Sequence, residues 1–130
     1  MQLGYTIIYV KDVVKTIEFY QKAFGIKLRF LHESNEYAEM ETGQTTLGFA
    51  SNEMAERNGF AIKQNSAKDI AAGFEIAFVS DNPKEKFDHA IKNGATPLSE
   101  PAKKPWGQTV AYVRDLNGCL VEICSPIATS

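Results

Sequence analysis

One nine-residue phrase occurs twice in this chain of 130 residues, and the repeat constrains the fold more than any other feature. GYTIIYVKD spans residues 4–12, and GFEIAFVSD spans residues 73–81. In both, a glycine and an aromatic residue begin a strand-like alternation that ends at an aspartate. A shift of 69 positions superimposes the two phrases and also aligns Gly25 with Gly94. Such self-similarity is typical of two copies of one structural unit.

Each copy predicts the same order of elements. The phrase alternates as a strand does, and Asp12 or the Asp81–Asn82 pair then supplies a helix N-cap. An apolar stripe at helical spacing follows, although Ile17 matches Phe87, one residue further along than the shift of 69 requires. Three strands come after each helix: residues 26–33, 37–42 and 45–51 in the first copy, and residues 95–101, 108–115 and 119–125 in the second.

The fold predicted is therefore α+β, with two tandem βαβββ modules in a single domain over residues 1–130. Module one covers about residues 3–51 and module two about residues 73–126. The polar connection 52–72 includes a possible helical turn at EMAER. It is long for a plain loop, so a lid over a site and a simple surface tether are both open interpretations.

Composition narrows the class of protein. A net charge of −2 provides no attraction to nucleic acid or to an anionic membrane surface. No apolar run approaches the roughly 20 residues that span a bilayer. The N-terminus lacks a basic region and enters a strand pattern at once, so we expect no signal peptide. Cys119 and Cys124 would be too far apart along a strand to bridge, which favours buried thiols and a cytoplasmic location.

Two longer stretches resemble one known family. VKDVVKTIEFYQKAFGIKL resembles the helix entry of the vicinal oxygen chelate superfamily, and PWGQTVAYVRDLNGCLVEICSP resembles its final hairpin. That superfamily includes glyoxalase I, extradiol dioxygenases and bleomycin-resistance proteins. The resemblance implies that each module curls into a half-barrel, that two modules form a cup with helices outside, and that the protein is a homodimer.

The same resemblance identifies positions where metal-dependent members carry ligands. They correspond here to Tyr5, Phe74, Leu47 or Gly48, and Glu122. Neither a phenyl ring nor a neutral phenol is a good ligand for a divalent ion, so one carboxylate remains. We therefore expect no metal and no cofactor.

Three other polar residues near these positions need an assignment. Glu75 adjoins Phe74, so strand parity predicts that Glu75 points out of the cup unless a bulge reverses it. His32 lies at a polar strand edge and His89 lies on the second helix, where we expect solvated surface residues.

Aromatic side chains take the place of the missing ligands. If Tyr5 and Phe74 face the cup, alternation carries Ile7, Tyr9, Ile76 and Phe78 inward with them. The predicted ligand-binding residues are Tyr5, Tyr9, Phe74, Phe78, Trp106 and Glu122. They indicate a metal-independent protein that binds a small aromatic or cationic compound. The alternatives are a lyase, isomerase or dioxygenase that uses Glu122 as a base or residual ligand, and a plain apolar core.

Overall fold

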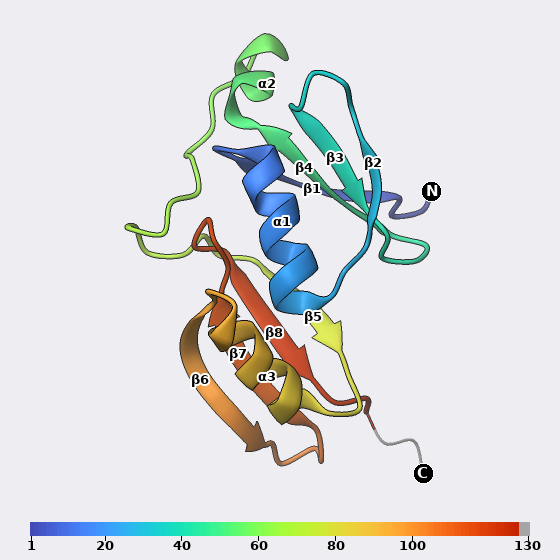
Figure 1. The fold of residues 1–130 in the computed structure, drawn as a ribbon, viewed down its shortest axis with the longest axis vertical. Helices are drawn as coiled ribbons and strands as arrows, with labels where there is room; N and C mark the ends of the chain where they lie inside the picture. The colour runs from blue at the N-terminus through green and yellow to red at the C-terminus, as the bar shows by residue number, and fades with distance from the viewer. Residues whose placement is uncertain (128–130) are drawn as a thin grey trace. The chain divides into compact units, whose positions relative to one another are not determined.

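Each half of the chain forms a four-stranded mixed sheet with a long helix packed on it (Figure 1). The structure, a computed structural model, describes residues 1–127. Contacts divide the chain into two units, Met1–Asn65 and the part from Ser66 onward. The prediction of an α+β fold with two tandem βαβββ modules is confirmed, and each sheet is open along its edges.

The first unit has the strand order β1-β4-β3-β2, with β1 parallel to β4 and the other neighbours antiparallel. Its elements are β1 (Tyr5–Val10), α1 (Val13–Phe24), β2 (Leu28–Leu31), β3 (Tyr37–Met40), β4 (Thr46–Ser51) and α2 (Asn52–Arg57). The short helix α2 lies in the polar connection, where the sequence predicted a helical turn.

The second unit repeats this topology as β5-β8-β7-β6, with β5 parallel to β8. Its elements are β5 (Glu75–Val79), α3 (Pro83–Lys92), β6 (Thr96–Lys103), β7 (Thr109–Arg114) and β8 (Leu120–Cys124). A parallel pair of first and last strands needs a crossover, which the helix of each module supplies.

The helix ends follow the predicted chemistry more closely in module one than in module two. The Asp12 carboxylate accepts a hydrogen bond from the Lys15 amide at 3.0 Å, and Gly25 ends α1 in the left-handed conformation at φ 67°. In module two Asn82 is the N-cap without a side-chain cap bond, and Pro83 occupies the first turn. In module two the predicted N-cap bond is thus missing and the C-cap is Asn93, next to Gly94, so α3 is the more weakly capped helix.

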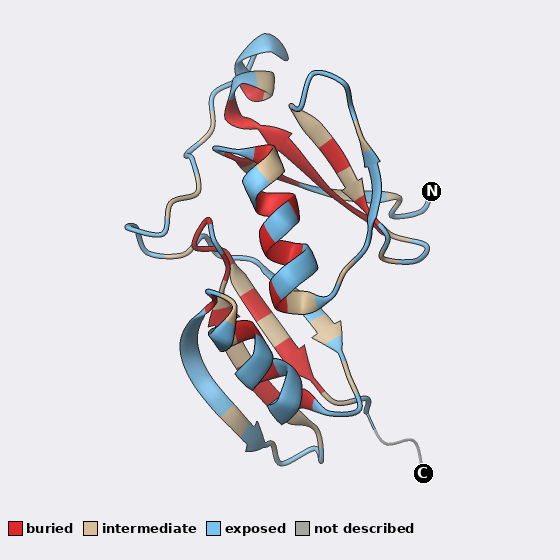
Figure 2. Cartoon of the chain, viewed as in Figure 1, coloured by how far each residue is buried: buried red, intermediate tan, exposed pale blue. Residues whose placement is uncertain are grey.

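In each unit the core lies between the helix and one face of the sheet (Figure 2). In module one Tyr20 of α1 packs against Phe49 of β4 with ring centroids 4.8 Å apart, and both are fully buried. In module two the buried side chains of α3 and of the two central strands include Phe87, Ala90, Ala111, Val113, Val121 and Ile123. Burial of these apolar side chains stabilises each sheet against its helix.

Two expectations from the sequence concern membrane-spanning helices and the two cysteines. Within residues 1–127, none of the helices is both long enough and apolar enough to cross a membrane. Cys119 and Cys124 are buried and free, as predicted. Burial raises the pKa of the Cys119 thiol to about 12 and that of Cys124 to about 11, so both stay protonated near neutral pH and are poor nucleophiles.

Candidate functional site

The sheet of module two carries a tyrosine and a glutamate that are bonded to each other. Tyr112 on β7 lies directly opposite Glu122 on β8. The Tyr112 hydroxyl donates a hydrogen bond to Oε1 of Glu122 at 2.9 Å. This bond, followed by burial, raises the pKa of Tyr112 to about 12, because both favour the neutral phenol. At neutral pH Tyr112 therefore acts as a fixed hydrogen-bond donor to the carboxyl group.

A second carboxyl group lies next to the first. Ala77 of β5 pairs with Glu122, and Glu75 precedes Ala77 by two residues, so Glu75 projects from the same sheet face. Burial raises the pKa of Glu75, and a hydrogen bond to Glu122 and the charge of Glu122 raise it further. Two neighbouring carboxyl groups resist losing both protons, because like charges at close range repel. The neighbouring Glu122 therefore favours the protonated form of Glu75.

These residues define the open face of module two, which is the sheet face away from α3. The opposite face is the core face, because Val113, Val121 and Ile123 on it are at most 2% exposed. On the open face Glu122 and Tyr112 are partly exposed and Glu75 is exposed. The site-forming groups are thus within reach of a solute.

The predicted assignment of faces is wrong for module two. Phe78 pairs with Ile123, so its side chain lies on the core face rather than beside Glu122. Phe74 precedes β5 and is 37% exposed, and by alternation it does not share the side of Glu75. No bulge is needed to bring Glu75 beside Glu122, because regular pairing of β5 with β8 does so.

The error has a simple origin in the register of the repeat. The helices start at Val13 and Pro83, which are 70 positions apart, whereas the repeated phrase matches at 69. The strands follow the helices: Ile7 pairs with Gly48 in the same way as Ala77 pairs with Glu122. A shift of one residue moves every side chain of a strand to the other face. Glu75, and not Phe74, is therefore the counterpart of Tyr5.

The open face of module one is aromatic rather than acidic. It carries Tyr5, Ile7 and Tyr9 of β1, as predicted, and Tyr5 and Ile7 are 59% and 43% exposed. Gly48 lies opposite Ile7, where module two has Glu122. A Cβ atom at Gly48 would be 3.2 Å from the Tyr37 hydroxyl, so the Tyr37 ring occupies space that a side chain would need.

Module one also has a tyrosine–glutamate hydrogen bond on its open face, built from different positions. Glu39 of β3 lies opposite Gly48, as Tyr112 lies opposite Glu122. The Tyr37 hydroxyl donates to Oε2 of Glu39 at 2.9 Å. Burial, and then this bond, raise the pKa of Tyr37 to about 12. Each sheet thus holds a neutral phenol against a carboxylate.

The remaining predicted residues lie elsewhere. Trp106 is 61% exposed in the turn between β6 and β7, and its indole N–H donates to Oε1 of Gln108 at 2.8 Å. His32 contacts the Ser34 hydroxyl at 2.8 Å, and His89 lies on α3 near Asn93. Both histidines are exposed, as the sequence predicted.

The side chains at the predicted ligand positions do not fit a divalent metal site. Gly48 offers no donor atom, and Tyr5 offers a neutral phenol, which binds divalent ions poorly. Glu75 and Glu122 supply two carboxyl groups, one more than the sequence predicted. Across residues 1–127, no three His, Cys, Asp or Glu side chains are gathered so that they could hold a metal ion.

Comparison with known protein families shows to which family the chain belongs. A model described as the glyoxalase/bleomycin resistance protein/dioxygenase superfamily matches residues 2–123. The chain belongs to this superfamily. The resemblance seen in the two sequence stretches is thereby confirmed.

Several superfamily members with known sequences or structures resemble the chain. The uncharacterized protein YraH of Bacillus subtilis (strain 168) is 29% identical over 116 residues, which cover 88% of this chain and 90% of YraH. A glyoxalase-related enzyme from Fulvimarina pelagi has the same fold with a TM-score of 0.82 at 18% identity, covering 97% of this chain and 88% of that one. A family enzyme from Burkholderia phytofirmans PsJN gives 0.76 at 22% identity, with 98% and 100% covered.

Proposed function

We propose that this superfamily member is a metal-independent binding protein that holds a small aromatic or cationic compound on the open face of a sheet. The carboxyl pair of Glu75 and Glu122 is the observation that carries the proposal. Both groups lie on the sheet face opposite α3, and Glu122 disfavours ionisation of Glu75. A bound cation relieves this repulsion and allows both groups to ionise.

The aromatic side chains of module one support the other half of the proposal. Tyr5 and Tyr9 are exposed or partly exposed on the open face, and Ile7 lies between them on the same strand. The flat faces of such rings bind planar apolar groups and attract cations. Within residues 1–127 the Tyr5 hydroxyl makes no hydrogen bond, so it is available to a ligand.

A second candidate function is a proton-transfer reaction. One observation favours it: Glu122 raises the pKa of the neighbouring Glu75, while the Tyr112 hydroxyl donates a hydrogen bond to Glu122. A carboxyl group with a raised pKa is suited to acid–base catalysis near neutral pH. In this alternative Glu122 is the base that removes a proton from a small substrate, and no metal takes part.

Thermal-shift measurements with an aromatic ammonium compound and its uncharged analogue test the binding proposal, because a ligand of the folded state raises the melting temperature. We expect the cation to raise the melting temperature of the native protein, and this rise to be smaller in Glu122→Gln and in Glu75→Gln. Glu100→Gln, an exposed change on β6, is the matched control and should retain the effect. An unchanged response in Glu122→Gln would rule out this site.

Elemental analysis of the purified protein tests the metal-independent part. We expect no stoichiometric divalent metal, and about one zinc, nickel or iron ion per chain would contradict the proposal. Turnover of a substrate that disappears in Glu122→Gln would favour the enzyme over the binding protein.

Two further parts of the proposal concern the setting of the protein. The family resemblance supports a homodimer, which light scattering of the purified protein would reveal as twice the mass of one chain. The free thiols of Cys119 and Cys124 support a reducing compartment, for which we propose the cytoplasm. Microscopy of a tagged protein in its source cell tests the location.

A further inference from the structure

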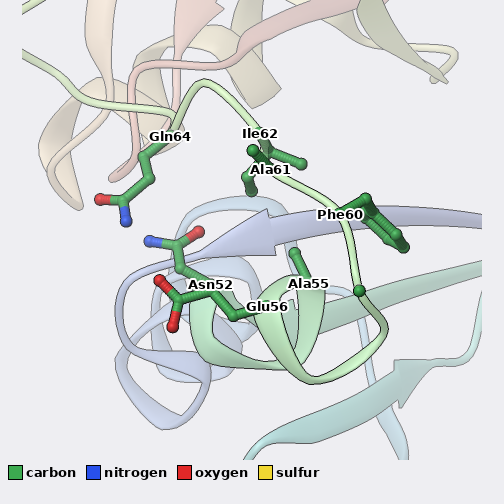
Figure 3. Close-up of a pocket in the computed structure, with 8 residues that line it drawn as sticks. Asn52, Ala55, Glu56, Phe60, Ala61, Ile62 and Gln64 are labelled. Atoms are coloured by element: carbon green, nitrogen blue, oxygen red, sulfur yellow. The ribbon is translucent and has the colours of Figure 1, made fainter.

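Module one contains a pocket whose lining residues all belong to α2 and to the segment that follows it. It lies between α2 and the segment 59–64 that follows it, and its volume is about 440 Å³ (Figure 3). Pockets that bind small molecules in proteins commonly have volumes of about 300–1,000 Å³. The pocket is therefore large enough for a small organic compound.

Hydrogen bonds hold the segment 59–64, which forms one wall of the pocket, in place. The amide of Phe60 donates to the Ala55 carbonyl at 3.2 Å, so the chain turns back over α2. At the other end of the segment, the Asn65 side chain donates to the Tyr9 carbonyl at 3.1 Å. The rings of Tyr9 and Phe60 meet edge to face with centroids 6.2 Å apart. The pocket is thus built against β1 from both ends.

Asn52 is a residue of this pocket with an unsatisfied polar atom. It is 7% exposed, and its Oδ1 atom is buried without a hydrogen-bond partner. Buried polar atoms are nearly always bonded, and an unbonded one costs about 1–3 kcal/mol. Figure 3 shows the Asn52 side chain among the residues that line the pocket, with its amide nitrogen on the side of Gln64 and its Oδ1 atom on the opposite side. A donor group in the pocket would satisfy this atom.

The other polar groups that line the pocket indicate which charge such a donor would carry. The Glu56 carboxylate is close to the two side-chain amides in Figure 3, and no lysine, arginine or histidine lines the pocket. Arg57, the next residue along α2, is bonded to Glu36 instead. A buried acceptor and a carboxylate among the lining residues favour a positively charged donor.

Apolar side chains complete the pocket. Ala55 and Ile62 lie between the polar end and Phe60, so a compound that fills the pocket presents its charged end to Asn52 and an apolar body to these residues. We propose that this pocket is a second binding site, for a small primary amine that carries an apolar or aromatic group. Its ammonium group donates to Asn52 Oδ1 and pairs with Glu56.

The first test uses 2-phenylethylammonium as the probe and 2-phenylethanol as its uncharged match. The probe is titrated into the isotope-labelled full chain and followed by the NMR signals of the side-chain amides. We expect the signals of Asn52 and Gln64 to shift with the ammonium compound and to stay in place with the alcohol. Equal shifts with both compounds would overturn the proposal. So would the absence of any shift at about 20 mM, a concentration well above the dissociation constant of about 1 mM of a weak ligand.

Charge variants on one helix provide a matched comparison. Glu56→Gln removes the charge that lines the pocket, and Glu53→Gln removes one on an exposed position of α2 outside it. We expect Glu56→Gln to weaken binding about 5-fold or more, which corresponds to a partly screened ion pair, and Glu53→Gln to change it less than about 2-fold. Equal effects of the two variants would refute a specific role for Glu56.

Glu122→Gln separates this site from the proposed function. If the pocket is a site of its own, the shifts of Asn52 and Gln64 persist in Glu122→Gln with unchanged affinity. Loss of those shifts in this variant would overturn the second site. A crystal structure grown with the amine provides the last check: density for a single water on Asn52 Oδ1, with no amine in the pocket, would also overturn it.

Discussion

The carboxyl groups of Glu75 and Glu122 are neighbours because Ala77, two residues after Glu75, pairs with Glu122 across the parallel strands β5 and β8. Tyr112 binds Glu122 from the other side. Three strands thus bring an acid pair and a phenol to one open sheet face. In module one the corresponding strands bring Tyr5, Ile7 and Gly48 together, so the two modules share a topology but offer different chemistry.

The carboxyl pair predicts a specific dependence of stability on pH. The pKa of Glu75 is raised above its ordinary 4.5 in the folded protein, so the folded state holds this proton more tightly than the unfolded state. The contribution of Glu75 to stability is therefore complete below pH 4.5 and is lost as the pH rises through the folded pKa. Urea unfolding at a series of pH values should show native stability falling relative to Glu75→Gln across this range.

Glu122→Gln is the second variant in that experiment. It removes the charge and the carboxylate partner of Glu75 but leaves the burial of Glu75 in place, so it should reduce the pH dependence without abolishing it. A constant difference between the native protein and Glu75→Gln at every pH would contradict the pairing of the two carboxyl groups.

The phenol bonds predict two tyrosines that ionise late. Tyr37 and Tyr112 have pKa values of about 12, each raised by a bond to a carboxylate and by burial. Phenolate absorbance after a rapid pH jump, read before unfolding, should contain a component from Tyr37 and Tyr112 that titrates near pH 12. Glu122→Gln should lower the pKa of Tyr112 toward its ordinary 10.0 and leave Tyr37 unchanged. A shift in both residues, or in neither, would contradict the assignment.

The sequence predicted the modules well and the faces of the second one badly. The repeat, the N-cap at Asp12 and the C-cap at Gly25 depend on local chemistry, which a sequence shows directly. The face to which each side chain of a strand points depends on the register of the strand, because a shift of one residue moves every side chain to the other face. Ile17 and Phe87 match at a shift of 70 positions, whereas the repeated phrase matches at 69. This difference was the sign that the phrase is one residue out of register, and a shift of 70 would have paired Tyr5 with Glu75.

Some features of the site carried no sequence signal. The unbonded Oδ1 of Asn52 and the pocket beside it depend on how the segment after α2 folds back on the sheet. The bond from Trp106 to Gln108 was also not predicted. Such contacts are set by tertiary packing of loops, whose paths periodicity does not define.

Gly48 should tolerate no side chain. Its added Cβ would be 3.2 Å from the Tyr37 hydroxyl and 3.3 Å from the Ala38 carbonyl, and the latter cannot move without disturbing β3. Gly48→Ala should therefore lower the free energy of unfolding by about 1–3 kcal/mol, the usual cost of overpacking. Gly4→Ala is the control, because nothing lies within 4 Å of the Cβ added there. Equal denaturant midpoints for the two variants would contradict this packing.

Gly118 should be the most sensitive glycine of module two, for two reasons that can be separated. Its φ of 82° lies in the left-handed region, which costs a residue with a side chain about 1–2 kcal/mol. Its added Cβ would also come within 2.6 Å of the Ser66 carbonyl and 2.4 Å of Nη2 of Arg114. That guanidinium also donates to the Asp69 carbonyl at 2.7 Å, so it fastens the segment 66–69 to the β7–β8 hairpin.

Gly107→Ala separates the two effects, because Gly107 has a φ of 93° and nothing within 4 Å of its added Cβ. We expect Gly107→Ala to show the conformational cost alone, and Gly118→Ala to lose about 2–3 kcal/mol more because crowding adds to strain. Hydrogen exchange should also show the amide of Asp69 opening more often in Gly118→Ala, since the Arg114 bonds that hold this segment must move. Equal losses of stability in the two variants would mean that the segment yields without cost, and that Arg114 does not fasten it.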